Sequence, residues 1–318
     1  MTHESLREPH QPAIDCWYLT GPTASGKTST GVELAGLLDA EIISLDSMAL
    51  FRDMNIGTAK PTAAQRERVP HHLLDLVDPN EEFSLANYLG AAHNAIDEIR
   101  GRGKEVLFVG GTPLYLKSLL RGVQQGPPPD WEFREQIEQE LEEVGMQALH
   151  QRLKALDPLS AAKLHPNDKR RIIRALEFYR ATGEPISHAQ MQFDEGRPAD
   201  QCRVFALRWP REELHQRIER RVEAMFDMGL VEEVKELVRK YGKLSRTASQ
   251  AVGYREASDH LDGKTDLADA IDAVISRTRQ FARRQETWFR SLSECRFVEM
   301  TEHDPARTAQ RILDAVAK

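Results

Sequence analysis

The chain has 318 residues, and its 43 lysines and arginines against 50 aspartates and glutamates give a formal net charge of −7. At roughly 100–200 residues per domain, this length predicts about two domains. The longest apolar runs fall well short of the roughly 18 residues that a membrane span needs. The polar N-terminus lacks the apolar stretch of a secretory signal, so we expect a soluble, cytoplasmic protein without a membrane partner. The acidic balance argues against indiscriminate nucleic-acid binding but leaves room for a local basic stripe.

Strands and helices alternate over the first part of the chain. A short apolar run at 16–20 ends at Gly21, and apolar residues return at helical spacing over 27–38. Further strands are predicted at 41–45, at 73–77 and from Glu105, a helix is predicted at about 84–100, and Thr112 and Pro113 begin another helix that Gly122 ends. Strands that are apolar on both faces and separated by helices predict an α/β fold with a parallel sheet.

The pattern changes after the proline-rich segment 126–130. Residues 131–182 show helical periodicity without a convincing strand, and strand character returns only at 203–209. Long helices at 211–240 and 266–292 and a last strand at 296–300 follow. We therefore predict a discontinuous core domain made of 1–122 and 201–318, with a helical insertion at 123–200.

A phosphate-binding loop, or P-loop, is the most specific motif. Gly21, Pro22, Thr23, Ala24, Ser25, Gly26, Lys27 and Thr28 match the pattern of two glycines four residues apart followed by Lys and Thr, between a predicted strand and helix. Chance produces such a match on the order of once in 100 proteins of this length. The glycines let backbone amides face phosphate oxygens, Lys27 neutralises their charge, and Thr28 can bind Mg²⁺. The loop alone does not distinguish ATP from any other diphosphate.

Carboxylates elsewhere give a weaker signal. A P-loop NTPase usually has a second acid at the end of another apolar strand, but the strand from Glu105 ends in Gly110, Gly111 and Thr112. Asp75 and Asp78 are possible substitutes, although loop acids are the simpler interpretation. Asp46 follows the second strand at the sheet edge where ligands bind, so it is a candidate general base as well as a candidate turn residue.

Six motifs in this order and spacing resemble one known family over nearly the whole chain. They are Gly-Pro-Thr-Ala-Ser-Gly-Lys-Thr (21–28), Asp-Ser-Met-Ala (46–49), Gly-Thr-Ala-Lys-Pro (57–61), Gly-Gly-Thr-Pro-Leu-Tyr (110–115), Val-Gly-Tyr-Arg (252–255) and Thr-Arg-Gln-Phe-Ala-Arg-Arg-Gln (278–285). The set is similar to the signature of the bacterial tRNA dimethylallyltransferases. One departure is Phe51, where the family often has Tyr. The resemblance implies transfer of a dimethylallyl group from dimethylallyl diphosphate to the exocyclic amine, N6, of adenosine 37 beside the tRNA anticodon, with Mg²⁺ as cofactor.

The resemblance also implies roles for single residues. The P-loop would hold the diphosphate leaving group, and Asp46 would take the proton of the adenine amine. Lys27, Thr23 and the pair Arg217 and Arg221, which are four residues apart on one helix face, are candidates to stabilise the departing diphosphate. Pairing of these arginines with Glu213 or Glu219 is the alternative.

Two basic segments, around Lys169–Arg174 and Arg277–Arg290, can follow an RNA backbone or can be solvated faces paired with acids. With the resemblance, the tRNA-binding set is Asp46, Ser47, Met48, Ala49, Thr112, Arg134, Arg170, Arg171, Ile172, Ile173, Arg174, Gln250, Ala251, Val252, Gly253, Tyr254, Arg255, Thr278, Arg279, Gln280, Phe281, Ala282, Arg283, Arg284 and Gln285.

The sequence thus predicts a magnesium-dependent tRNA prenyltransferase with a P-loop α/β core, expected to act as a monomer on the tRNA anticodon stem-loop. Two rivals remain. A small-molecule kinase would use the same loop for ATP and Asp46 to activate a hydroxyl, and a non-catalytic RNA-binding protein would use the loop as a nucleotide-sensing switch.

Overall fold

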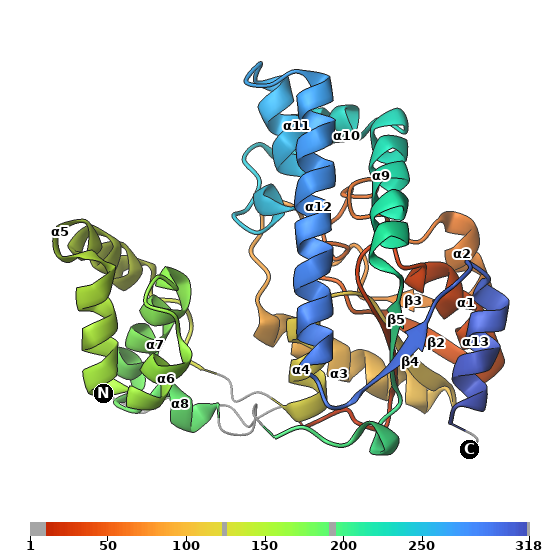
Figure 1. The fold of residues 1–318 in the computed structure, drawn as a ribbon, viewed down its shortest axis with the longest axis horizontal. Coiled ribbons are helices and arrows are strands. Elements are labelled where there is room, and N and C mark those ends of the chain that lie inside the picture. The colour runs from red at the N-terminus through yellow and green to blue at the C-terminus, as the bar shows by residue number, and fades with distance from the viewer. Residues whose placement is uncertain (1–10, 123–125, 191–194, 317–318) are drawn as a thin grey trace. The chain divides into compact units, whose positions relative to one another are not determined.

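A computed structural model describes residues 11–122, 126–190 and 195–316. It divides into two compact units, a larger one of Ala13–Leu120 with Gly196–Lys318 and a smaller one containing Arg121–Glu195 (Figure 1). Among the described residues, no helix has both the length and the apolar character required to cross a membrane.

The larger unit is built on a six-stranded parallel sheet. Its strands are β1 (Trp17–Thr20), β2 (Ala40–Ser44), β3 (His71–His72), β4 (Glu105–Val109), β5 (Val204–Arg208) and β6 (Cys295–Glu299), in the order β3-β2-β4-β1-β5-β6. Every strand pair is parallel, and Tyr18 of β1 lies between Phe108 of β4 and Val204 of β5. This confirms the predicted parallel α/β fold. The carboxyl ends of β1, β2 and β4 consequently meet at one edge of the sheet.

Alternation along β1 explains how this short strand joins two layers. Trp17 and Leu19 belong to the main apolar cluster, to which α1 (Lys27–Leu38) and α13 (Pro305–Asp314) also contribute. Tyr18 points the other way, where its ring stacks on Phe108 at 4.9 Å between centroids. The helix α3 (Leu85–Gly101) contacts β2 and β4. The strand is therefore buried on both faces, as parallel strands usually are.

The helices after β5 extend the core beyond the sheet. They are α9 (Arg211–Asp227), α10 (Leu230–Tyr241), α11 (Tyr254–Leu261) and α12 (Leu267–Arg290). Helices α9 and α12 run side by side (Figure 1), and both bury apolar residues in the cluster that covers the sheet. A second cluster packs α10 and α11 against the segment that follows β2, with Phe51 and Tyr254 fully buried.

The third predicted strand is misplaced. The apolar run 73–77 was expected to be a strand, but the strand that pairs with β2 is His71–His72, and Val77 makes only an isolated bridge with Phe51. Leu73 and Asp75 have φ angles of 59° and 55°. These left-handed conformations turn the chain and are incompatible with a continuous strand.

The smaller unit is helical. Its helices are α5 (Trp131–Leu156), α6 (Pro158–Lys163), α7 (Lys169–Thr182) and α8 (Ile186–Ala189). The side chains of Asp130, Asp157 and Asp168 each accept a backbone N–H at the start of α5, α6 and α7, which is the usual way to satisfy exposed helix amides. Gly145, with φ of 78°, breaks α5 into two segments. Between 190 and 204, the described residues add only a short 3₁₀ turn, Ala199–Gln201.

Candidate active site

The P-loop connects β1 to α1 through a tightly packed backbone. Gly21 has φ of 140°, and a Cβ there would lie 2.7 Å from the carbonyl oxygen of Leu207. Gly26 caps α1 in a left-handed conformation with φ of 92°. The Lys27 ammonium donates to the carbonyl of Pro22 at 2.7 Å and to the Ser25 hydroxyl at 3.5 Å. The ammonium is thus folded back over the loop, where a bound anion would sit.

Both predicted arginines of α9 lie at this loop. The Arg217 Nε donates to the carbonyl of Ala24 at 2.9 Å, and its guanidinium stacks on the Trp209 ring at 4.3 Å. Trp209 in turn donates to the carbonyl of Ser25 at 3.0 Å. The sequence left open that Arg217 pairs with Glu213 or Glu219, but these contacts with Ala24 and Trp209 hold it instead. Glu219 accepts a hydrogen bond from Arg279 of α12 at 3.1 Å.

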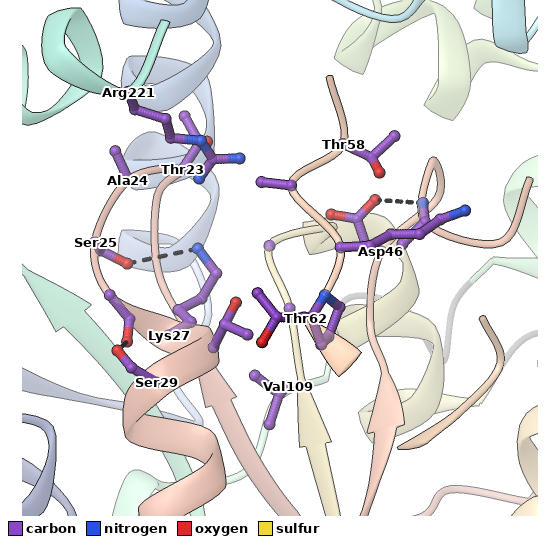
Figure 2. Close-up of a pocket in the computed structure, with 18 of the residues that line it drawn as sticks. Thr23, Ala24, Ser25, Lys27, Ser29, Asp46, Thr58, Thr62, Val109 and Arg221 are labelled. Carbon is purple, nitrogen blue, oxygen red and sulfur yellow. Dashed lines mark hydrogen bonds between the residues drawn. The ribbon is translucent and has the colours of Figure 1, made fainter. Parts of the chain in front are cut away.

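Positive charges crowd one wall of the site. Burial, and then repulsion by Arg221, lowers the pKa of the Lys27 ammonium to about 7, while Asp46 acts in the opposite direction. Burial also lowers the pKa of the Arg221 guanidinium, again with Asp46 opposing the shift. Figure 2 shows Lys27 and Arg221 on the P-loop side of the pocket and Asp46 across from them, its carboxylate turned inward. Asp46 offsets these positive charges only in part, so the wall suits the anionic group of a phosphorylated ligand.

Asp46 begins a tight turn after β2. One oxygen, Oδ1, accepts the backbone N–H of Met48 at 2.8 Å and of Ala49 at 3.2 Å. The Thr112 hydroxyl accepts the N–H of Ser47 at 3.1 Å. Gly110 packs so closely against this turn that a Cβ would lie 2.2 Å from the carbonyl oxygen of Leu45. The carboxylate is therefore held on a turn fixed by the end of β4.

A single cavity of about 720 Å³ joins these parts. Its lining includes Thr23, Ala24, Ser25, Gly26, Lys27, Thr28, Asp46, Ala49, Gly110, Gly111, Arg217, Arg221, Phe281 and Gln285, and also Asn55, Ile56, Thr58, Ala59, Lys60, Pro61, Thr62, Gln65, His71, Arg220, Met225 and Met228. Of the quoted sequence motifs, 21–28, 46–49, 57–61, 110–115 and 278–285 all contribute to it.

Sequence reasoning missed the residue that holds the wall formed by 55–61. The Glu233 carboxylate on α10 accepts the backbone N–H groups of Asn55, Ile56 and Gly57 at 2.8–3.4 Å. It also accepts the Tyr254 hydroxyl at 2.7 Å. A Cβ on Gly57 would lie 2.4 Å from the Tyr254 ring. The motif at 57–61 marked this wall, but it did not indicate that Glu233, 176 residues after Gly57, holds it.

Asp75 and Asp78 are engaged elsewhere. Asp75 accepts from Lys60 at 2.6 Å and from Arg66 at 3.0 Å, and Asp78 pairs with Arg52 at 2.8 Å. Neither lines the cavity, which supports the interpretation of both as loop acids. Within the described residues, no group of three or more His, Cys, Asp or Glu side chains is arranged to hold a metal ion.

The predicted tRNA-binding residues separate into exposed and buried groups. On α12, Gln280, Phe281, Arg283 and Arg284 are exposed, whereas Ala282 and Gln285 are buried. In the segment 250–255, Gln250 and Arg255 are exposed, while Ala251, Gly253 and Tyr254 are buried. Tyr254 and Gln285 make internal hydrogen bonds, and Ala49 is buried as well. Of these buried residues, Ala49 and Gln285 line the cavity, whereas Ala251, Gly253, Tyr254 and Ala282 do not. The tRNA-binding set stays a prediction.

The candidates in the smaller unit separate in the same way. Ile172 and Ile173 are 0% and 4% exposed in its apolar core, so a side-chain contact with RNA at these positions is incorrect. Arg134 and Arg174 both donate to the buried Glu177 carboxylate. Arg170 and Arg171 are exposed. The helical period explains the error, because a run of five consecutive residues on α7 cannot share one face.

Fold and cavity together define a class of protein. A P-loop at the edge of a parallel sheet, several cations and one opposing carboxylate share a cavity, as expected of a P-loop enzyme acting on a phosphorylated substrate.

Comparison with known proteins identifies the family. The family model described as IPP transferase matches residues 49–292, and that described as isopentenyl transferase matches 14–75. A tRNA dimethylallyltransferase of Rhodopirellula baltica is 49% identical, over 100% of this chain and 98% of its own. The solved tRNA isopentenylpyrophosphate transferase of Bacillus halodurans is 38% identical with a TM-score of 0.69, covering 96% of each chain. A eukaryotic dimethylallyltransferase acting on tRNA has a TM-score of 0.72 at 30% identity, covering 89% of this chain and 73% of its own. The chain belongs to the IPP transferase family and is an enzyme of that family.

Proposed function

We propose that the protein transfers a dimethylallyl group from dimethylallyl diphosphate to N6 of adenosine 37 next to the tRNA anticodon and releases diphosphate. The observation that carries this proposal is the shared cavity, in which the P-loop cations face the Asp46 carboxylate. Relatives named tRNA dimethylallyltransferase, which match 100% and 89% of this chain, support the same reaction.

The chemistry follows from that opposition of charges. As the adenine amine attacks, a nitrogen–carbon bond forms and the carbon–oxygen bond to diphosphate breaks, with its electron pair leaving on the diphosphate oxygen. Asp46 accepts the proton that the amine loses. Lys27, Arg217 and Arg221, with the Thr23 hydroxyl, stabilise the charge that builds on the leaving group.

Apolar side chains of the cavity suit the donor's hydrocarbon part. Phe281, Met225 and Met228 line the same space as the cations, so one ligand with a charged head and a branched apolar tail satisfies both linings.

The donor set fits a magnesium ion bound together with diphosphate. Thr28 lies in the first turn of α1 and lines the cavity, and Mg²⁺ usually takes one or two protein oxygens, several waters and the oxygens of a substrate phosphate. We propose that Thr28 is its protein ligand. When bound, the ion neutralises charge on the departing diphosphate.

RNA would use exposed basic residues of α12 and α7. Arg283 and Arg284, and Arg170 and Arg171 in the smaller unit, are exposed and can follow a phosphate backbone. We propose that the protein acts in the cytoplasm as a monomer on the anticodon stem-loop, where removing one adenine from its stack costs least.

The test is a reaction of the purified protein with dimethylallyl diphosphate, Mg²⁺ and unmodified tRNA. We expect nucleoside mass analysis to find dimethylallyl-adenosine at position 37 and one diphosphate per modified base, with loss of product for an RNA carrying guanosine there. ATP turnover without prenyl transfer would instead identify a kinase, and nucleotide-dependent RNA binding without a modified base would identify a binding switch.

A further inference from the structure

The Gln285 side chain is buried at the junction of the two chemical halves of the site. It is 3% exposed, although Arg283 and Arg284 beside it on α12 are exposed. Its Oε1 accepts the backbone N–H of Thr23 in the P-loop at 2.8 Å. Its Nε2 donates to the carbonyl of Gly111, just after β4, at 2.6 Å. One amide group thus joins the P-loop to the β4 end.

The β4 end also holds the carboxylate turn. Gly111 is followed by Thr112, whose N–H donates to the carbonyl of Leu45 at 3.1 Å and whose hydroxyl accepts the N–H of Ser47 at 3.1 Å. These two bonds flank Asp46 on both sides. A continuous series of hydrogen bonds therefore runs from the P-loop through Gln285 and Thr112 to the turn that carries Asp46.

The backbone around Gln285 is adapted to this close approach. A Cβ on Gly111 would lie 2.6 Å from the Gln285 Nε2 and 3.6 Å from the Lys27 Cε. Only glycine leaves the amide room to reach the carbonyl. A glutamine is also required chemically, because the position needs one acceptor and one donor, and an ionised glutamate supplies only acceptors.

We propose that Gln285 is a positioning residue, which holds the diphosphate-binding loop and the Asp46 turn at the separation that prenyl transfer requires. This proposal rests on the proposed function. Transfer needs the donor carbon and the amine within a few ångströms, and a displacement of about 1 Å can cost roughly 100-fold in rate. The role differs from the RNA contact expected from the motif at 278–285, because both ends of the amide are engaged within the protein, by Thr23 and Gly111.

The first test replaces the amide by an apolar group of similar length, Gln285→Met, with the exposed Gln310→Met on α13 as the matched control. We expect the rate of single-turnover transfer, with both substrates saturating, to fall by about 10- to 100-fold. The tRNA dissociation constant should change by less than about twofold. Hydrogen exchange of the Thr23 amide should accelerate in Gln285→Met and not in the control.

Other outcomes overturn the proposal. A raised tRNA dissociation constant with an unchanged saturated rate would make Gln285 an RNA contact. A lower melting temperature with normal transfer by the folded fraction would make it a stability residue. If the wild-type protein transfers no prenyl group, the proposed function fails, whereas unchanged Thr23 exchange in Gln285→Met overturns the positioning role by itself.

A second variant tests the donor half of the amide. In Gln285→Glu the ionised side chain cannot donate to Gly111, but protonation restores a donor. The transfer rate of this variant, divided by that of wild type at each pH, should rise as the pH falls toward the pKa of the new carboxyl. A flat ratio would contradict a role for the Gly111 hydrogen bond.

Discussion

Charge at single residues controls how the site receives its ligand. Burial lowers the pKa of both Lys27 and Arg221, repulsion by Arg221 lowers that of Lys27 further, and Asp46 opposes both shifts. An empty cavity with this composition is electrostatically unfavourable, and an anionic ligand relieves the repulsion between the cations. The cations lie on the wall opposite Asp46 (Figure 2). They therefore hold the diphosphate away from the carboxylate, which reduces the repulsion between the two.

Lys27 should make ligand binding depend on pH. With a folded-state pKa of about 7 against a usual value of 10.5, its charge destabilises the free protein below pH 7, and this cost is relieved as the pH rises from 7 toward 10.5. Binding of diphosphate then needs proton uptake above pH 7. Calorimetry in buffers of different ionisation enthalpy should detect this uptake in wild type and find less of it in Lys27→Arg. Equal proton uptake in both proteins would contradict the assignment of the uptake to Lys27.

Lys27→Ala should lose affinity for diphosphate while retaining tRNA binding.

Asp46→Asn tests the general base. The amide retains an oxygen that can accept the Met48 and Ala49 amides, so the turn should persist while the charge and basicity are lost. We expect single-turnover transfer at saturating substrates to fall by about 10²–10⁴-fold, with substrate affinities changing much less. A fall of less than about tenfold would make Asp46 a positioning residue and require another proton acceptor.

At the scale of elements, the sequence predicted regular structure better than irregular structure. The helix at 27–38 was predicted with its observed bounds, and the strands at 41–45 and 296–300 are each displaced by one residue. The strand at 73–77 failed because two left-handed residues interrupt it, which hydrophobicity does not reveal. Glu233 was not recognised as a site residue, and Gln285 was predicted only as a tRNA contact, because the groups that they bind lie far away in sequence. Motif spacing found Gly57 and Gly111 and also Tyr254 and Gln285, which pack against them, but it did not show that these residues meet.

Helix α12 has two sides with different consequences for RNA binding. Arg283 is exposed, so Arg283→Ala should weaken tRNA binding and reduce the slope of log affinity against log salt by about 0.7 for one lost phosphate contact. Arg239→Ala, on an exposed position of α10, is the control. Arg279 instead pairs with Glu219 of α9. We expect its substitution to lower the free energy of unfolding and to leave the salt dependence of tRNA binding nearly unchanged. An unchanged slope in Arg283→Ala would identify α12 as an ordinary solvated face.

The cavity wall at 55–57 depends on α10 through one carboxylate. Three backbone N–H groups and the Tyr254 hydroxyl donate to the two oxygens of Glu233. Glu233→Gln replaces one of these oxygens by an N–H₂ group, which leaves the donors on that side without an acceptor. Leaving such donors unsatisfied should destabilise this wall by about 1–3 kcal/mol, measured as faster hydrogen exchange over 54–60 and a raised KM for the prenyl donor. The control is Glu232→Gln, because the adjacent Glu232 pairs with Lys235 on the exposed side of α10. This variant should behave like wild type. Equal exchange in the two variants would refute the role of Glu233.

At the scale of the whole molecule, the two units divide the work. All residues that line the cavity belong to the larger unit, so binding of diphosphate should not require the helical unit. The smaller unit has its own apolar core and its own buried carboxylate, Glu177, which accepts from Arg134, Arg174 and the backbone of Asp130. Burial acts to raise the pKa of Glu177, but these hydrogen bonds outweigh it and hold the pKa below 4.5.

Glu177→Gln should therefore affect only the smaller unit. Breaking a buried ion pair costs about 3 kcal/mol, so hydrogen exchange over 131–182 should accelerate, and the KM for tRNA should rise while diphosphate affinity stays unchanged. Because the folded-state pKa is depressed, the stabilisation that Glu177 provides is present above pH 4.5 and is lost as the pH falls further, a loss the variant should lack. Glu184→Gln, at an exposed position of the same unit, is the control. Weakened diphosphate binding in Glu177→Gln would contradict the independence of the two units.

The position of β1 in the sheet constrains how the protein can be synthesised. The strand pairs with β4 on one side and with β5 on the other, and the helical unit is translated between β4 and β5. A nascent chain that has not yet reached Val204 therefore presents β1, buried on both faces in the finished protein, as an unpaired apolar edge. The P-loop obtains its contact with α12 still later in synthesis, because Thr23 and its partner Gln285 are separated by 262 residues. A chain that stops before Val204 contains β1–β4 but neither β5 nor β6, so its incomplete sheet is prone to aggregate and it has no complete site. We therefore expect the nascent chain to depend most on chaperones until the C-terminal third has been synthesised.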